Sequence, residues 1–173
     1  NKARSLDFEA RGEVLLLACN PAETLLAITN SLNRLALFSL TRALTLGDKR
    51  FKEHIAAVTF SENGRMLAVA SGSCVEIFAA PESADNILLE PFLLLKRHNL
   101  GFTPCLAGFG GEDRFLLLGG EEGAARIQSA LPEKKCNFSF GFTGHKSRVA
   151  AVVDGLAGGW TATVDLNGLV LLW

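Results

Sequence analysis

The chain has 173 residues, of which 49% are hydrophobic and 20% are charged, enough apolar side chain for a substantial buried core. Its 17 Lys and Arg against 18 Asp and Glu give a formal net charge of −1, so overall charge draws it neither to nucleic acid nor to a membrane surface. No apolar run is long enough to span a bilayer, since Glu90 and Pro91 interrupt the longest one, 87–95. The chain starts at Asn1 without an initiator Met or signal peptide, and we expect it to be a segment of a longer protein.

Nothing in the cysteine and histidine pattern predicts a metal or a cofactor. The four cysteines are far apart, and neither a C-x-x-C pair nor a zinc-ligand spacing with the three histidines occurs. We expect reduced thiols, most of them buried, as in cytosolic or nuclear proteins. The cysteines are Cys19, Cys74, Cys105 and Cys136.

Short apolar runs separated by Gly, Asn or Pro recur along the chain and predict β-strands rather than helices. Three groups of three strands are predicted, each with a turn after the first strand, and a fourth, outer strand follows each group. The predicted strands are 14–19, 25–29, 35–40 and 43–46; then 54–60, 66–70, 75–78 and 92–95; then 105–109, 115–118, 124–127 and 137–142.

The stretch 143–173 carries the most specific pattern. A Gly144-His145 pair is followed by an apolar run, by Thr163, by an Asn167-Gly168 turn and by an apolar strand that ends at Trp173. A buried imidazole needs hydrogen-bond partners. We predict that Asn167 supplies one from the turn, and that the Thr163 hydroxyl links the imidazole to the indole N–H.

A catalytic alternative for His145 is a nucleophile–base system with a nearby Thr and Asp165. No nucleophile lies in a strained elbow motif, and a structural role accounts for all four positions of the pattern. We therefore interpret His145 as structural.

This stretch resembles a WD repeat, and weaker copies of it precede it. The position of Trp173 is filled earlier by Phe38, Phe78 and Gln128, at intervals of 40, 50 and 45 residues. The position of His145 is filled by Ala10, Phe51 and Leu100. The resemblance implies an all-β fold, a WD-repeat β-propeller with about four four-stranded blades at 12–47, 53–96, 102–143 and 144–173. Because an open arc of blades exposes strand edges, we expect these blades to form part of a larger ring.

Three segments resemble the early blades of the periodic tryptophan protein 2 family. They are 58–65 (VTFSENGR), 71–81 (SGSCVEIFAAP) and 165–173 (DLNGLVLLW), with a long insertion at 82–102. The resemblance implies a nuclear, nucleolar scaffold without catalytic activity. Such a scaffold assembles proteins and precursor rRNA in the ribonucleoprotein complex that processes the small-subunit ribosomal RNA precursor, with no membrane, small-molecule substrate or cofactor.

Basic residues concentrate in three places, each predicted to lie between an outer strand and the next inner strand. Such connections emerge on one face of a propeller, so the clusters could form one basic rim that binds RNA phosphates or an acidic partner segment. Solvated polar loops explain the same pattern. The clusters are Lys49, Arg50 and Lys52; Lys96 and Arg97; and Lys146 and Arg148.

One other functional class remains possible, and two others lack support in the sequence. A WD-repeat adaptor of an unrelated complex, such as a ubiquitin-ligase receptor or a trafficking coat, fits the same repeats. A propeller enzyme requires acidic or His residues gathered at one channel mouth, and no such pattern occurs. The glycine-rich stretches 108–111 and 119–123 lack the phosphate-binding G-x-x-x-x-G-K-[ST] pattern, so we interpret them as hairpin turns.

Overall fold

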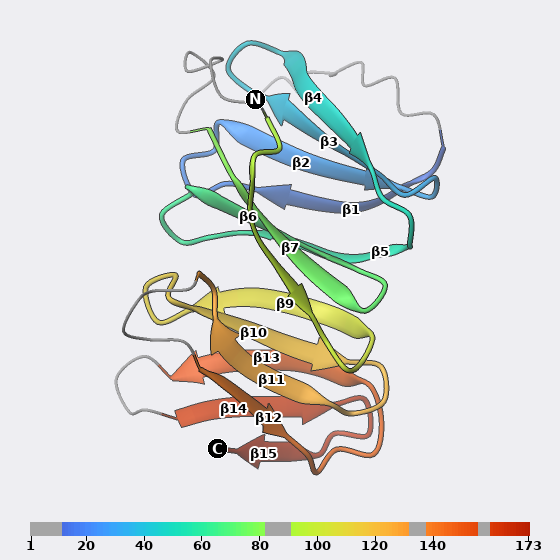
Figure 1. Ribbon diagram of the computed structural model, residues 1–173, viewed down its shortest axis with the longest axis vertical. Coiled ribbons are helices and arrows are strands. Elements are labelled where there is room, and N and C mark those ends of the chain that lie inside the picture. The colour runs from blue at the N-terminus through green and yellow to red at the C-terminus, as the bar shows by residue number, and fades with distance from the viewer. Residues whose placement is uncertain (1–11, 82–90, 132–137, 156–159) are drawn as a thin grey trace, which may run out of the picture.

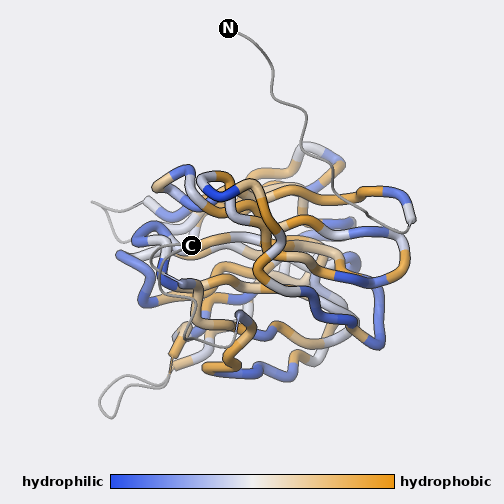
Figure 2. The backbone as a smooth tube through the Cα atoms, turned by 90° about the horizontal axis from the view of Figure 1, so that it is seen from above, coloured by the Kyte–Doolittle hydropathy of each residue, from blue (hydrophilic) through white to orange (hydrophobic). Residues whose placement is uncertain are grey.

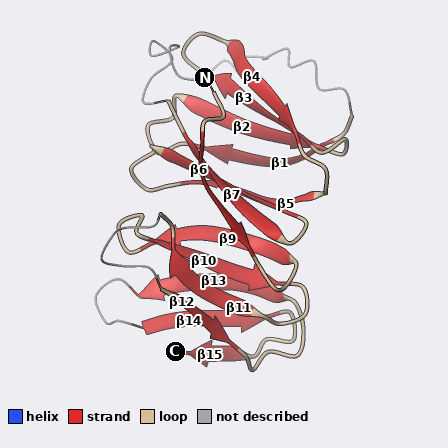
Figure 3. Cartoon of the chain, viewed as in Figure 1, coloured by secondary structure: helices blue, strands red, loops and turns tan. Residues whose placement is uncertain are grey.

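The computed structural model describes residues 12–81, 91–131, 138–155 and 160–173. All the regular elements in these ranges are β-strands, and they form four antiparallel sheets (Figures 1 and 3). The predicted all-β fold with four blade-like sheets is confirmed. None of the described residues forms a helix that could cross a membrane.

Each of the first three sheets is a four-stranded meander, in which every strand pairs with the strand that follows it. The first sheet contains β1 (Val14–Cys19), β2 (Leu25–Asn30), β3 (Arg34–Ser39) and β4 (Leu44–Arg50). The second contains β5 (Ile55–Phe60), β6 (Met66–Ser71), β7 (Cys74–Ala79) and β8 (Leu94–Asn99). The third contains β9 (Pro104–Gly110), β10 (Phe115–Gly120), β11 (Ala125–Ser129) and β12 (Ser139–Phe142).

The fourth sheet has three strands among the described residues. They are β13 (Val149–Gly155), β14 (Trp160–Asp165) and β15 (Val170–Leu172). Trp173 continues the pairing past β15, because its backbone N–H and carbonyl exchange hydrogen bonds with Thr161. The sheets do not close into a ring within the described part of the chain.

The sheets follow one another along the long axis of the molecule, with their first strands adjacent (Figure 1). β5 contacts β1 on one side and β9 on the other, and β13 contacts β9 and β10. The connections β4–β5, β8–β9 and β12–β13 consequently all lie along one edge, on the right in Figure 1. In Figure 2 hydrophobic residues follow the strands, and many of the connections are hydrophilic.

Apolar side chains fill the spaces between neighbouring sheets. Leu37 of the first sheet belongs to one buried cluster with Leu67 and Phe78 of the second. Ile77 of the second sheet belongs to another with Leu116 of the third. Each fully buried side chain of this size contributes about 1.5–3 kcal/mol relative to exposure, so sheet-to-sheet packing dominates the stability of the assembly.

The outer strands end later than the sequence indicated. β4 runs through Arg50 and β8 through Asn99, because Arg50 pairs with Arg34 of β3 and Asn99 pairs with Cys74 of β7. The first two basic clusters therefore lie largely on strands, and not in the connections after them as predicted. An outer strand needs little apolar patterning, since backbone pairing alone extends it past the last hydrophobic residue.

Both ends of the stack expose apolar strand surface. At one end Leu17 of β1 is 62% exposed, and at the other Val153 of β13 and Leu172 of β15 are 61% and 66% exposed. At the internal junctions the corresponding first strand β5 buries Ile55 and Phe60. The two end surfaces are therefore apolar like the surfaces buried between neighbouring sheets, but no described residue covers them.

Candidate functional site

A chain of polar side chains links the segment before β13 to β14 and to Trp173, directly after β15. The Nε2 atom of His145, which precedes β13, lies 2.6 Å from Oγ1 of Thr163 on β14. The indole Nε1–H of Trp173 donates to the same oxygen at 2.9 Å. One hydroxyl therefore joins the start of the sheet to its last strand.

The carboxylate beside His145 belongs to Asp165. Its Oδ2 lies 3.2 Å from Nδ1 of His145, and both side chains are 1% exposed. Asn167 was predicted in this place, but in the structure it occupies the turn and donates its backbone N–H to Oδ1 of Asp165, as Leu169 also does. The turn after β14 is longer than the predicted pattern assumed. Asn167 therefore lies beyond the imidazole, and the Asp165 carboxylate, two residues earlier, faces it.

Burial acts to raise the pKa of Asp165, but its hydrogen bonds outweigh that effect. The backbone N–H groups of Leu169 and Asn167 stabilise the carboxylate, and the His145 imidazole adds to them, so that the pKa lies below its ordinary value. In the neutral tautomer with its proton on Nδ1, toward this carboxylate, the imidazole would accept from the Thr163 hydroxyl at Nε2.

This geometry suits a structural role within the fourth sheet better than a role as a nucleophile. Thr163 is 1% exposed, and its oxygen already contacts both His145 and Trp173. A nucleophile must reach its substrate, and this hydroxyl has no exposed surface from which to do so. The Trp173 ring also stacks on Phe142 of the third sheet at 4.8 Å between ring centroids, which ties the network to the neighbouring sheet.

Among the described residues, apolar side chains fill the equivalent places in the earlier sheets, except for Gln128. Phe51 and Leu100, at the histidine position, are both buried. Phe51 meets Phe78, at the tryptophan position, edge to face at 6.3 Å. Gln128 is buried in the third sheet, and its Nε2 makes no hydrogen bond within the described residues. The fourth position, Ala10, lies outside the described residues.

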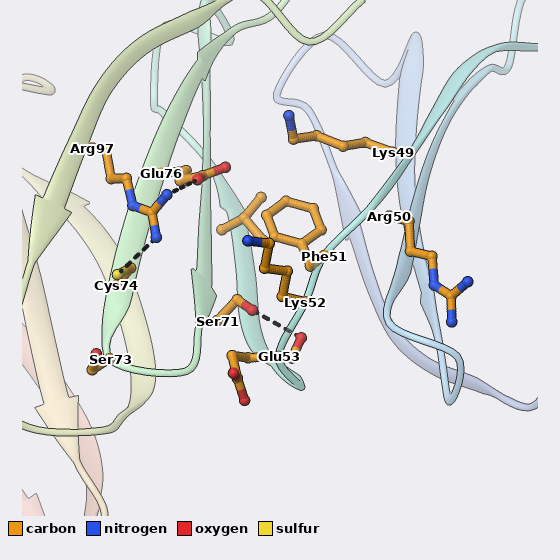
Figure 4. A pocket seen from close by; sticks show the side chains of 11 residues that line it. Lys49, Arg50, Phe51, Lys52, Glu53, Ser71, Ser73, Cys74, Glu76 and Arg97 are labelled. Atoms are coloured by element: carbon orange, nitrogen blue, oxygen red, sulfur yellow. Dashed lines mark hydrogen bonds and ion pairs between the residues drawn. The ribbon is translucent and has the colours of Figure 1, made fainter.

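The first two basic clusters converge on a polar cleft between the first and second sheets. The cleft has a volume of about 380 Å³, and Arg97 of β8 faces Lys49 and Lys52 across it (Figure 4). Ser71, at the end of β6, lies between the two sides, while the Arg50 side chain is directed away from the others in this view. Residues from two sequence-distant clusters, Lys49 and Lys52 from one and Arg97 from the other, thus line one cleft.

Contacts within the cleft hold several of its side chains in place. Arg97 lies 3.4 Å from the Glu76 carboxylate and donates to Sγ of Cys74 at 3.4 Å. Lys49 lies over the ring of Phe78, with its Nζ 5.1 Å from the centroid. The Ser71 hydroxyl donates to the backbone carbonyl of Glu53 at 2.9 Å.

The third basic cluster lies elsewhere. Arg148 precedes β13 and lies 3.6 Å from the carboxylate of Glu121, at the turn that follows β10. Lys146 is exposed nearby in sequence, before β13. Lys96 is half-buried on β8 and does not line the cleft. The third cluster therefore lies apart from the cleft that Lys49, Lys52 and Arg97 line.

The sequence did not identify the uncharged part of the cleft or its acidic residues. Ser71, Ser73 and Cys74 belong to the segment 71–81 that supported the family resemblance, but no charge pattern marked them as site residues. Among the described residues, no group of three or more His, Cys, Asp or Glu side chains is placed to hold a metal ion. Cys19, Cys74 and Cys105 are free thiols, and Cys136 lies outside the described residues.

Comparison with known proteins finds relatives that share one name. The chain is 28% identical over 174 residues to Periodic tryptophan protein 2 of Saccharomyces cerevisiae, covering 100% of this chain and 19% of the relative. The chain resembles Periodic tryptophan protein 2. The fission yeast Periodic tryptophan protein 2 homolog is 25% identical over 174 residues, with 100% and 20% coverage. Periodic tryptophan protein 2 of Arabidopsis thaliana is 28% identical over 158 residues, with 90% and 17% coverage.

The predicted resemblance to periodic tryptophan protein 2 is confirmed by these relatives. The chain spans about a fifth of the length of the curated relatives that it matches. No protein-family model matches it.

Proposed function

We propose that this chain is a non-catalytic WD-repeat scaffold in ribosome biogenesis. Its similarity to Periodic tryptophan protein 2 over the whole chain carries the proposal. The scaffold would assemble other proteins and precursor rRNA in the complex that processes the small-subunit rRNA precursor, in the nucleolus. The buried Thr163 hydroxyl supports a role without catalysis, because the His145 network holds a sheet together and exposes no reactive group.

We also propose that further blades cover both ends of the stack, so that the four sheets are one sector of a larger ring. The exposed Leu17 and Leu172 support this arrangement, because apolar strand surface of this kind is normally covered. The blades of this sector would be those predicted at 12–47, 53–96, 102–143 and 144–173.

RNA contact by this scaffold would be made mainly to phosphates. The residues of the predicted basic clusters that lie outside the cleft, Lys96, Lys146 and Arg148, are the candidates for it. Phosphate contacts position a nucleic acid without reading its sequence. Each cation lost should therefore lower the salt dependence of binding by about one unit, without changing the sequence preference.

The scaffold role is tested by tagging the full-length protein in its own organism and purifying it under native conditions. Co-purification with small-subunit rRNA precursor, and accumulation of unprocessed precursor on depletion, are the expected results. If the protein instead purifies with a ubiquitin ligase or a trafficking coat and without precursor rRNA, it is an adaptor of an unrelated complex and the proposal is wrong.

A further inference from the structure

The cleft between the first two sheets has an unusual combination of charges. Four basic residues line it, from β4, the β4–β5 connection and β8, against the acidic Glu53 and Glu76. Glu76 is already paired with Arg97 at 3.4 Å. The lining keeps a net positive charge, so the cleft favours an anionic ligand.

The aromatic content of the cleft is poorly suited to single-stranded nucleic acid. Binding of that kind relies on exposed rings on which bases stack. The one aromatic residue of the lining, Phe51, is 8% exposed, and Lys49 lies near its ring at 5.9 Å. No ring surface of the lining is therefore available to a base.

The polar groups of the cleft match a peptide. An extended peptide brings backbone N–H donors as well as anionic side chains, and it needs acceptors for those donors. The Glu53 carboxylate and the hydroxyls of Ser71 and Ser73 supply acceptors beside the cations. A nucleic-acid phosphate backbone has no N–H donors for these acceptors, and the Glu53 carboxylate in the lining repels its negative charge.

The separation of the basic clusters points the same way. A long polyanion follows a continuous basic track. Here the cleft lies between the first two sheets, whereas Arg148 is paired with Glu121 at the third and fourth. The cleft is thus a local site of a size that suits a few side chains.

We propose that this cleft binds an acidic segment of a partner protein, with its Asp or Glu side chains against Lys49, Lys52 and Arg97. The inference rests on the scaffold role proposed above and gives the chemistry of one of its partners. Arg97 retains donors for a ligand carboxylate because it is 56% exposed, despite its contacts with Glu76 and Cys74. The Ser71 and Ser73 hydroxyls face the peptide backbone.

The experiment measures binding of a short fluorescein-labelled peptide, in which Asp and Glu alternate with Ser and Gly, to the full purified chain by anisotropy at low salt. A peptide with Asn and Gln at the acidic positions and a single-stranded RNA oligonucleotide are the comparison ligands. The double variant Lys52→Gln/Arg97→Gln removes two cleft cations. The double variant Lys146→Gln/Arg148→Gln is the matched control, since it also removes one Lys and one Arg, the latter likewise paired with a Glu.

We expect saturable binding of the acidic peptide and not of the amide peptide, about tenfold weaker for the cleft variant and nearly unchanged for the control. Any loss of RNA binding should instead follow the Lys146→Gln/Arg148→Gln variant. Equal losses for both variants would show a general charge effect and overturn the inference. Tighter binding of the RNA, with the loss confined to the cleft variant, would overturn it in favour of a nucleic-acid site. Absence of saturable binding to the wild type would also overturn it.

Two further measurements keep the outcome clear. If Arg97→Gln lowers the thermal midpoint, Lys49→Gln/Lys52→Gln replaces it as the cleft variant. Recovery of precursor rRNA with the tagged full-length protein is scored separately. Peptide binding without precursor rRNA would contradict the scaffold role alone, whereas precursor rRNA with no cleft-dependent peptide binding would contradict this inference alone.

Discussion

Asp113 Oδ1 accepts a hydrogen bond of 2.6 Å from the backbone N–H of Glu62, which belongs to the preceding sheet. The other carboxylate oxygen accepts from Asn63 N–H at 2.8 Å. The turn after β9 is thus hydrogen-bonded to the turn after β5. Asp154 repeats the arrangement one sheet further on, where its Oδ2 accepts from Gly111 N–H at 3.0 Å.

Asp113→Asn should lower the free energy of unfolding by about 1–2 kcal/mol, because an amide presents one acceptor where the carboxylate presents two. Asp113 has a φ of +67°, which Asn also tolerates, so backbone strain does not confuse the result. Urea unfolding measures the change. Glu112→Gln is the control, as Glu112 is exposed and has a φ of +57°. Equal effects of the two substitutions would contradict the role of the Asp113 carboxylate.

Thr163→Val should destabilise the chain by roughly 2–4 kcal/mol. The substitution keeps the shape but removes the hydroxyl that joins His145 to Trp173, leaving two polar groups without it. Denaturant unfolding followed by Trp fluorescence tests this. Thr161→Val, in a buried position on the same strand, should cost much less. A Thr163 variant as stable as the wild type would show that the network contributes nothing to stability.

Stability should fall on mild acidification because of His98. Burial lowers the pKa of His98, an effect to which Lys96 adds and which the Ala130 carbonyl partly offsets. The unfolded chain therefore binds the proton more readily than the folded one. The contribution of neutral His98 is complete above its ordinary pKa of 6.5 and declines as pH falls below that value.

His98 Nε2 donates to the Ala130 carbonyl at 2.9 Å, across the second and third sheets. His98→Gln removes the titrating group and keeps a donor, so it should lose less stability than the wild type between pH 7.5 and pH 5.5. Urea midpoints at the two pH values measure the difference. If the wild type and the His98→Gln variant lost the same stability between the two pH values, a group other than His98 would be responsible for the loss.

Charges placed on the exposed end faces should reduce self-association of the chain. Leu17→Lys together with Leu172→Lys interrupts apolar strand surface at both ends of the stack. Sedimentation velocity should give a smaller average mass for the variant, with little change in its thermal midpoint. A matched Arg42→Lys/Lys146→Arg variant keeps the charge and should behave as the wild type. A wild-type chain that is monomeric at all concentrations would contradict the proposal that further blades cover these faces.

The sequence by itself determined the strands and the order of the sheets. Short apolar runs with Gly, Asn and Pro between them gave β1 (Val14–Cys19) with its observed bounds and placed the other inner strands to within about two residues, because side-chain patterning and turn chemistry are local properties. The same holds for the spacing that brings Thr163 and Trp173 onto neighbouring strands of one sheet.

Only the tertiary structure decided which side chains meet. Asp165 rather than Asn167 faces His145 because turn width, which sequence spacing does not specify, sets the position of each carboxylate. Arg97 comes to face Lys49 because the first and second sheets pack against each other. The Asp113–Glu62 contact depends likewise on how one sheet stacks on the next. These contacts join residues tens of positions apart, and their geometry follows from packing between sheets rather than from any local pattern.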